Sequence, residues 1–241
     1  MDIYNYNSRS YGTNQEFQIV YFTYISRTFK TLFFQFLFTI GSLLLVRFNN
    51  QVSSFVINNV IPLFGIGSIG SIATIFYMTM ITSRKTEIQL AIFTLCETII
   101  LCAISINYGK DVVMMALTVT IGMSSAIGTY ALLTNINHSY LARSLYSVLT
   151  CLLTISIFNI FAGLHILYII ELYIGTLLFL GYIVYDIQHY LHDKSNISGY
   201  IQEDLHIDAA INIYIDIINI FVRLLEIIAR INGDRKQEKY I

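Results

Sequence analysis

Long apolar segments, separated by short polar stretches, are the feature that most restricts how this chain can fold. Hydrophobic residues make up 56% of its 241 residues and charged residues only 12%, and the mean hydropathy is +0.65. Soluble chains carry about twice that charged fraction. Helices and closed barrels are the structures that satisfy their backbone groups inside a bilayer, and segments of helical length favour the former. The sequence therefore predicts an all-α, polytopic membrane protein.

Polar breaks between the apolar segments give the bounds of seven predicted helices. The predicted helices are Phe29–Val46, a second from near Pro62 to the break at Ser83, Ile88–Ile106, Val112–Thr134, Leu141–Ala162, Leu167–Tyr190 and Glu203–Arg230. The segment Val52–Val60 is too short to span alone and is interpreted as a lead-in to the second helix. The chain then divides into a polar N-terminal tail (residues 1–28), a transmembrane helical bundle (29–230) and a charged C-terminal tail (231–241).

The last apolar segment, Glu203–Arg230, is interrupted by polar residues that recur every three or four positions. This polar stripe consists of Asn212, Asp216, Asn219, Arg223 and Glu226. Its spacing places all five residues on one face of a helix. An ionised side chain that faces lipid at mid-bilayer costs about 2.5 kcal/mol or more, so the stripe is expected to face protein or water inside the bundle. Arg223 and Glu226, one turn apart, are expected to neutralise each other.

Basic residues are distributed unevenly between the two sides of a seven-span arrangement. The N-terminal side carries Arg9, Arg27, Lys30, Arg84, Lys85, Arg143 and Lys194, whereas Arg47 and Lys110 lie opposite. This excess predicts a cytosolic N-terminus. The basic C-terminal tail also has cytosolic character, but seven full crossings would place it on the other side. Either the last helix is re-entrant, which its polar stripe permits inside protein, or the charge rule fails here.

Two other motifs are only weak indications of a nucleotide-binding or protease site. Gly65, Gly67 and Gly70 form a G-x-G-x-x-G pattern within an apolar run, without a strand before it or an acidic residue after it. Close helix packing explains this pattern better than a nucleotide-binding loop. The segment Gly122–Ser125 (G-M-S-S) lacks the G-x-S-G pattern of rhomboid-type serine proteases. The net charge of −1, with no Lys/Arg-rich run, argues against a nucleic-acid partner.

A zinc-dependent lipid hydrolase is the enzyme hypothesis that the sequence allows. Asp186, His189 and His192 have three-residue spacing on one helix face, and His206 follows in the next segment. Some seven-span lipid amidases use Asp and His for metal-activated hydrolysis. The other predicted spans supply no convincing further ligand or acid/base group. We therefore expect no enzymatic activity, no cofactor and no tightly bound metal.

Two C-terminal segments resemble the signature of the Bax inhibitor-1 family. They are Gly181–Gln188 (G-Y-I-V-Y-D-I-Q) and Ile211–Leu225 (I-N-I-Y-I-D-I-I-N-I-F-V-R-L-L), with an acidic loop between them. The order and spacing of the spans are similar to those of the family over nearly the whole chain. The length and the short charged C-terminal tail resemble the Bax inhibitor-1 branch more than its longer-tailed relatives.

The resemblance implies an endomembrane protein, usually of the endoplasmic reticulum, that suppresses apoptotic cell death and lets calcium leak from the store. It implies six helices around a central seventh. It also implies a pair of aspartates on the last two helices that forms a proton-sensitive latch on the pore, and these positions correspond to Asp186 and Asp216. Asn212 stands where the family often has an acidic residue. The arginine that pairs with the aspartates in some bacterial relatives has no counterpart within Ile66–Ile81.

Physical chemistry supports such a pair of aspartates independently. Two carboxylates held close in a low dielectric cannot both ionise cheaply, so they share a proton and titrate together. A cation also relieves the repulsion, and Ca²⁺ prefers oxygen ligands, so transient calcium binding at Asp186 and Asp216 is expected. The favoured function is a pH-sensitive calcium leak, formed by a protein whose helices contact membrane lipid. The alternative is a non-conducting protein that restrains apoptosis-regulating membrane partners.

Overall fold

The computed structural model describes residues 14–81, 85–134, 138–192 and 205–238. Within these ranges the chain is helical, with no strands. The α-helices are α1 (Asn14–Phe48), α2 (Asn50–Asn58), α3 (Val60–Phe76), α4 (Glu87–Ser105), α5 (Lys110–Leu133), α6 (His138–Ala162), α7 (His165–Asp186) and α9 (Leu205–Glu238). Two π-helical segments, Tyr77–Ile81 and Ile187–His192, continue α3 and α7.

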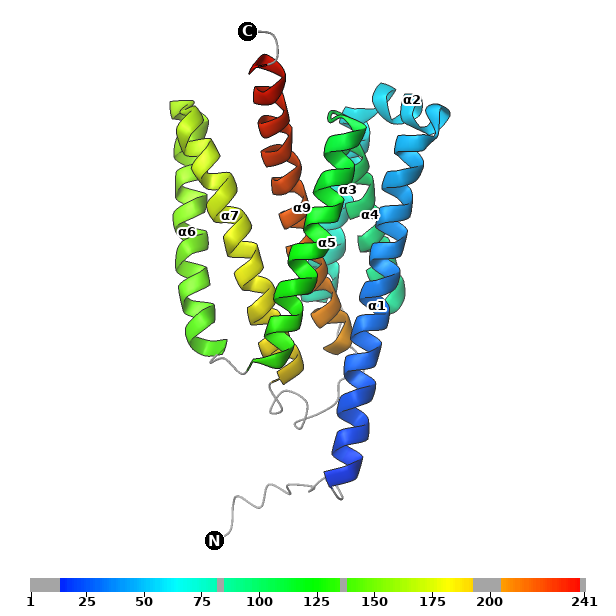
Figure 1. Cartoon of the computed structure of the whole chain (residues 1–241). Coiled ribbons are helices and arrows are strands. Elements are labelled where there is room, and N and C mark those ends of the chain that lie inside the picture. The colour runs from blue at the N-terminus through cyan, green and yellow to red at the C-terminus, as the bar shows by residue number, and fades with distance from the viewer. Residues whose placement is uncertain (1–13, 82–84, 135–137, 193–204, 239–241) are drawn as a thin grey trace.

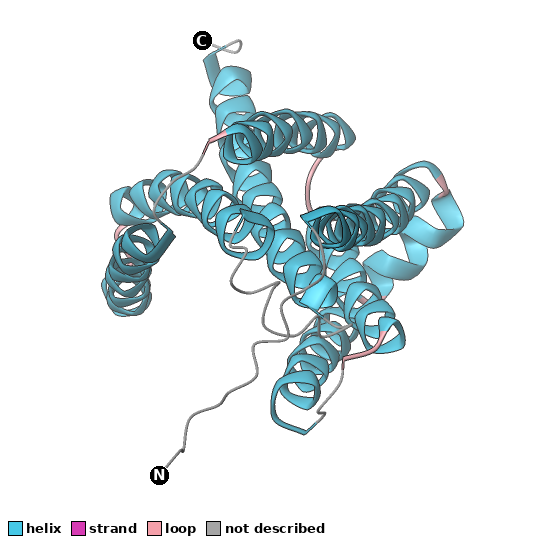
Figure 2. Cartoon of the chain, turned by 90° about the horizontal axis from the view of Figure 1, so that it is seen from below, coloured by secondary structure: helices cyan, strands magenta, loops and turns pink. Residues whose placement is uncertain are grey.

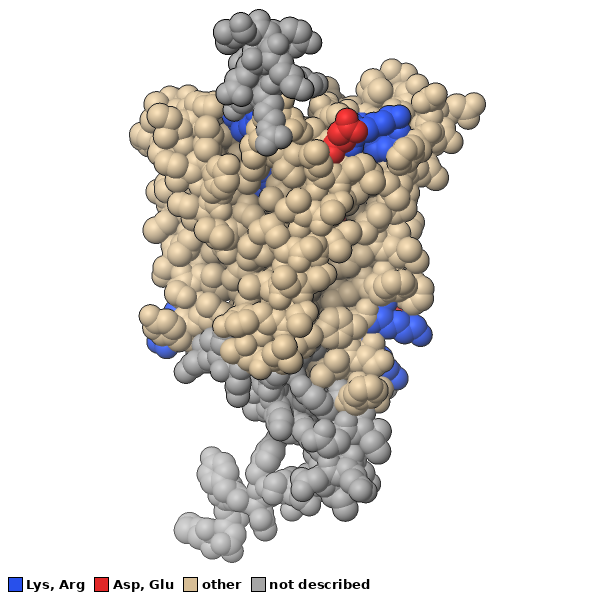
Figure 3. Space-filling view, viewed as in Figure 1, with Lys and Arg blue, Asp and Glu red and all other residues tan. Residues whose placement is uncertain are grey.

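Six of the described helices, α1 and α3 to α7, are long and apolar enough to cross a membrane. Large apolar side chains such as Ile61 and Phe161 are 85% and 86% exposed, which suits a surface covered by lipid. Figure 3 shows the same arrangement on one face of the molecule, where charged residues lie near the two ends and an uncharged band separates them. The chain is therefore an integral membrane protein.

Helix α9 runs along the bundle from the lower end to the upper end in Figure 1. Its 34 residues correspond to a length of about 51 Å, which exceeds the thickness of a bilayer core. Its charged residues set it apart from the six apolar helices. A seventh crossing by α9, or a re-entrant path, remains a prediction.

Both predicted tails are partly helical in the structure. Helix α1 begins at Asn14 rather than near Phe29, because no glycine or proline interrupts residues 14–29. At the other end, α9 continues beyond Arg230 to Glu238. Neither residue 28 nor residue 230 is therefore a helix boundary, and the apolar span of α1 itself begins at Phe22.

The segment Val52–Val60 does not continue directly into the second membrane helix, as the lead-in interpretation required. Most of it belongs to the separate helix α2, which lies across the upper end of the bundle (Figure 1). The Asn49 side-chain Oδ1 accepts hydrogen bonds from the backbone N–H groups of Gln51 and Val52, at 2.9 and 3.3 Å. This N-cap starts a helix of its own, and Pro62 falls in the first turn of α3, where a missing N–H costs little.

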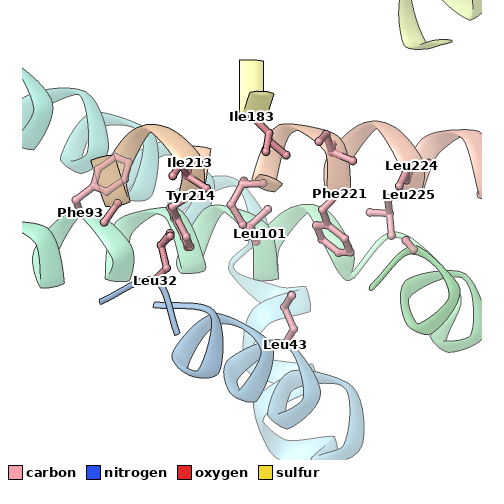
Figure 4. Close-up of a cluster of buried hydrophobic side chains, with 14 of the residues drawn as sticks. Leu32, Leu43, Phe93, Leu101, Ile183, Ile213, Tyr214, Phe221, Leu224 and Leu225 are labelled. Atoms are coloured by element: carbon pink, nitrogen blue, oxygen red, sulfur yellow. The ribbon is translucent and has the colours of Figure 1, made fainter. Parts of the chain in front are cut away.

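Helix α9 is the centre of the packing, since it contacts α1, α4, α5 and α7 and passes between the other helices in Figure 2. Tyr214 of α9 is fully buried. Its ring centroid lies 5.3 Å from that of Phe36 and 6.3 Å from that of Phe93, and its hydroxyl lies 2.8 Å from Oγ1 of Thr39. Figure 4 shows the surrounding apolar side chains, which come from α1, α4, α7 and α9.

Helices α3 and α4 approach each other at two of the three glycines of the G-x-G-x-x-G pattern. A Cβ atom added at Gly67 would lie 3.0 Å from the backbone carbonyl oxygen of Cys96, and one added at Gly70 would lie 2.7 Å from the sulfur of the same cysteine. A Cβ atom at Gly65 would meet no atom within 4 Å. The helix-packing interpretation is therefore confirmed for Gly67 and Gly70 but wrong for Gly65.

Candidate functional site

The structure brings Asp186 and Asp216 together between two antiparallel helices. Asp186 is the last residue of α7 and Asp216 lies in α9. Each residue is only 6% exposed, and their carboxyl groups face each other closely enough for one to hydrogen-bond to the other. An ionised carboxylate accepts hydrogen bonds but cannot donate one. A hydrogen bond across the pair therefore requires a proton on one of the two carboxyl groups.

One oxygen of this carboxyl pair has no protein partner. Oδ2 of Asp216 is buried and makes no hydrogen bond with any residue that the structure describes. A buried polar atom without a partner is costly and calls for an explanation, such as an unseen water or ion or a functional role. The pair therefore offers an acceptor that a proton or a cation can use.

The backbone changes its form directly after Asp186. The α-helix becomes the π-helical segment Ile187–His192, a feature often found at functional sites. Gln188 in this segment is 1% exposed. Its Nε2 donates hydrogen bonds to the backbone carbonyls of Ala131, at 2.6 Å, and Thr134. These bonds hold the end of α7, and with it Asp186, against the end of α5.

Asn212 and Asn219 have different roles in the polar stripe. Nδ2 of Asn212 donates to the hydroxyl of Tyr190 at 2.9 Å, which links α9 to the π-helical segment beside Asp186. Nδ2 of Asn219 instead donates to the carbonyl of Ile215 in its own helix. Tyr190 was absent from the sequence prediction, although it lies four residues after Asp186, on the same helix face.

The expected pairing of Arg223 with Glu226 is wrong. Nη1 of Arg223 donates to the backbone carbonyl of Glu171 in α7 at 3.2 Å, and its guanidinium lies 5.3 Å from the ring centroid of Phe179. Glu226 instead pairs with Arg230, with 2.9 Å between Oε1 and Nη2. A glutamate four residues before the basic residue has the better orientation in a helix, and Arg223 is directed towards α7.

The polar stripe continues at both ends beyond the five predicted residues. Asp208 lies four residues before Asn212 and forms an ion pair with Lys85. Arg230 lies four residues after Glu226, and its guanidinium stands 4.8 Å from the ring centroid of Tyr168. The same three-to-four-residue spacing that identified the stripe could have identified Asp208 and Arg230. Their partners could not be identified in this way, because they belong to other helices.

The described part of the chain contains no cluster of side chains that would support the zinc hypothesis. Among those residues, no group of three or more His, Cys, Asp or Glu side chains is placed to hold a metal ion. His189 stacks on Tyr185 with the ring planes 6° apart. His206 lines a groove between α1 and α4, and the side chain of His192 lies outside the described part. The carboxyl group of Asp186 faces that of Asp216 instead.

The central carboxyl pair, the buried last helix and the two motifs that carry the aspartates can be compared with known proteins. A sequence model described as "Inhibitor of apoptosis-promoting Bax1" matches residues 22–234. The chain belongs to the Bax inhibitor-1 family. The match covers most of the chain, so the recognition from Gly181–Gln188 and Ile211–Leu225 is confirmed.

Proteins similar to this chain come from a virus, an animal and a bacterium. The Golgi anti-apoptotic protein of vaccinia virus (strain Lister) is 27% identical over 231 residues, which cover 94% of this chain and 92% of the viral protein. Protein lifeguard 4 of Mus musculus is 25% identical over 237 residues, which cover 96% of this chain and 93% of the mouse protein. An uncharacterised membrane protein of Streptococcus pyogenes serotype M1 is 23% identical, and the match covers 79% of this chain and 84% of the bacterial protein.

Proposed function

We propose that this Bax inhibitor-1 family member suppresses apoptotic cell death from an endomembrane, such as the endoplasmic reticulum or the Golgi apparatus. The viral relative that matches nearly the full length of both chains is named as a Golgi anti-apoptotic protein, which supports this role and location. We further propose that the protein acts as a pH-sensitive calcium leak. The observation that carries this second proposal is the buried, closely placed carboxyl pair of Asp186 and Asp216.

The proton between the two carboxyl groups acts as the latch. With one proton present, the carboxyl groups attract each other and hold α7 against α9. When that proton leaves, two like charges about 4 Å apart repel each other by about 4 kcal/mol at an effective dielectric constant of about 20. This energy corresponds to about a thousandfold change in an equilibrium constant. Separation of α7 from α9 then opens the centre of the bundle. The π-helical segment Ile187–His192 accommodates this movement of α7 by a change in its backbone conformation.

Calcium relieves the same repulsion without a proton. The opened pair offers carboxylate oxygens, including the unpartnered Oδ2 of Asp216, and Ca²⁺ prefers such ligands. Two carboxylates supply too few oxygens for a complete coordination shell of six to eight. The ion is therefore held briefly, as transport requires, rather than bound as a permanent cofactor.

Calcium release from liposomes that contain the purified protein, measured across a range of pH, tests this proposal. Asp216→Asn and Asp186→Asn should each make the leak nearly independent of pH, because an amide keeps the shape of the carboxyl group but does not titrate. The double variant should add little, because the two residues act as one unit. Asp111→Asn, at an exposed position at the start of α5, is the matched control and should keep the wild-type pH response.

Three outcomes would contradict parts of the proposal. Additive effects of the two substitutions would refute the shared proton even if calcium flows. An absence of flux at every pH, with cell protection intact, would favour the non-conducting interaction protein. Zinc in the same preparation, together with loss of protection after joint replacement of His189 and His192 by glutamine, would favour the hydrolase.

A further inference from the structure

A groove of about 800 Å³ lies between α1 and α4, away from the carboxyl pair. One wall is formed by residues of α1 that recur at three- and four-residue intervals: Arg27, Lys30, Phe34 and Phe38. The facing wall comes from the first turns of α4, from Glu87 to Leu95. Because each set shares one face of its helix, the groove runs along the two helices from the end of the bundle towards the middle of the membrane.

The groove changes from charged to apolar along its length. Arg27 and Lys30 line the end nearer the N-terminus, and Phe38 lies about 16 Å further along α1, at 1.5 Å per residue. In Figure 3, Lys and Arg side chains are visible at the lower right, where the lower part of α1 runs in Figure 1. Neither Arg27 nor Lys30 forms an ion pair with any residue in the described ranges. Both charges are therefore available to an anionic group.

The apolar part of the groove is open to the bilayer. Phe34, Phe38 and Leu95 are 55%, 48% and 47% exposed, although they lie in helices that cross the membrane. The base of the groove is closed by buried residues, among them Leu90 of α4 and His206 of α9. An occupant would thus enter from the lipid side and would touch the first turn of the central helix.

We propose that this groove binds an anionic phospholipid of the surrounding leaflet. Its phosphate lies between Arg27 and Lys30, and one acyl chain lies along Phe34, Phe38 and Leu95. The charge balance supports an anion, since Glu87 is the one acidic residue among the described residues of the lining, against the two basic residues Arg27 and Lys30. The open apolar walls select a membrane lipid over a soluble anion, because such walls remain covered by acyl chains in the bilayer. Basic residues near the membrane surface attract anionic headgroups.

Lipid retention by the purified full-length protein tests the headgroup end of the site. In native mass spectrometry, the delipidated protein should retain phosphatidic acid about tenfold better than phosphatidylcholine with the same acyl chains. The double variant Arg27→Gln/Lys30→Gln should lose this preference and retain the two lipids about equally. Arg143→Gln removes a positive charge from the start of α6 and should keep the preference.

A second pair of variants tests the acyl-chain part without any change of charge. Ala91→Trp fills the groove from an exposed position on its α4 wall and should lower the retention of phosphatidic acid by a similar factor. Ile92→Trp places the same side chain at a position 49% exposed that does not line the groove, and should have no effect. Unchanged elution and helical content confirm that all variants fold.

Three results would overturn the assignment. Equal retention of phosphatidic acid and phosphatidylcholine by the wild type would exclude selection by Arg27 and Lys30. Wild-type retention of phosphatidic acid by the double variant, or by Ala91→Trp, would place the lipid elsewhere. Displacement of the lipid by inorganic phosphate at an equal concentration would show a site for a free anion, in which the apolar walls contribute nothing.

Discussion

Replacing Gly67 by alanine is expected to push α3 and α4 apart, although alanine is the stronger helix former. The added Cβ atom would lie 2.7 Å from Cγ1 of Ile100 and 3.0 Å from the carbonyl oxygen of Cys96. The isoleucine side chain can rotate, but the carbonyl belongs to the backbone of α4 and cannot move alone. The two helices must therefore separate by several tenths of an ångström, as close packing leaves no other space.

The size of the effect follows from two opposing contributions. Overpacking of a tight contact costs about 1–3 kcal/mol, whereas the change from glycine to alanine within a helix returns about 0.5–1 kcal/mol. The net loss of unfolding free energy is about 1 kcal/mol, which lowers the Tm of a chain of this size by about 2–4 °C. At Gly65 no atom lies within 4 Å of the added Cβ atom. Only the favourable contribution remains there, and the Tm should stay the same or rise.

Thermal unfolding of the purified variants in detergent, at one heating rate, measures these shifts as apparent Tm values, because such unfolding is often irreversible. Gly65→Ala is the matched control on the same helix. Gly70→Ala should fall between the two, since the atom it meets is the movable sulfur of Cys96. An apparent Tm of Gly67→Ala equal to or above that of Gly65→Ala would refute the close α3–α4 contact.

Two further predictions concern the upper end of the bundle and the orientation of the chain. Burial and the Glu226 carboxylate raise the pKa of the Tyr108 phenol, so its contribution to stability is complete below the ordinary phenol pKa of about 10 and is lost as the pH rises above it. The Tm difference between wild type and Tyr108→Phe should therefore shrink above that pH. A constant difference would contradict the hydrogen bond that the Tyr108 hydroxyl donates to Oε2 of Glu226. A reporter on the N-terminus, or a cysteine at Arg84, should be accessible from the cytosol without permeabilisation of the store. Protection of both sites would reverse the orientation, and a tag at Tyr240 would show whether α9 crosses.

The fold class and the position of the last helix could be derived from local sequence patterns. Apolar segments of bilayer length must become helices, because lipid offers no hydrogen-bond partner to the backbone. The spacing of Asn212, Asp216 and Asn219 places them on one face, which cannot be exposed to lipid cheaply. The resemblance of Gly181–Gln188 and Ile211–Leu225 to one family then indicated which two carboxyl groups to pair. None of these steps needed the orientation of a neighbouring helix.

The partners of the polar residues, by contrast, were decided by the tertiary structure. Whether Arg223 pairs with Glu226 or turns to the carbonyl of Glu171 depends on the depth and rotation of α7, which no short stretch of sequence encodes. The α1–α4 groove likewise combines Arg27 with Leu95, two residues far apart along the chain. A helical period specifies which side chains share a face. Which face meets which is set by the packing of whole helices, where many weak contacts are optimised together.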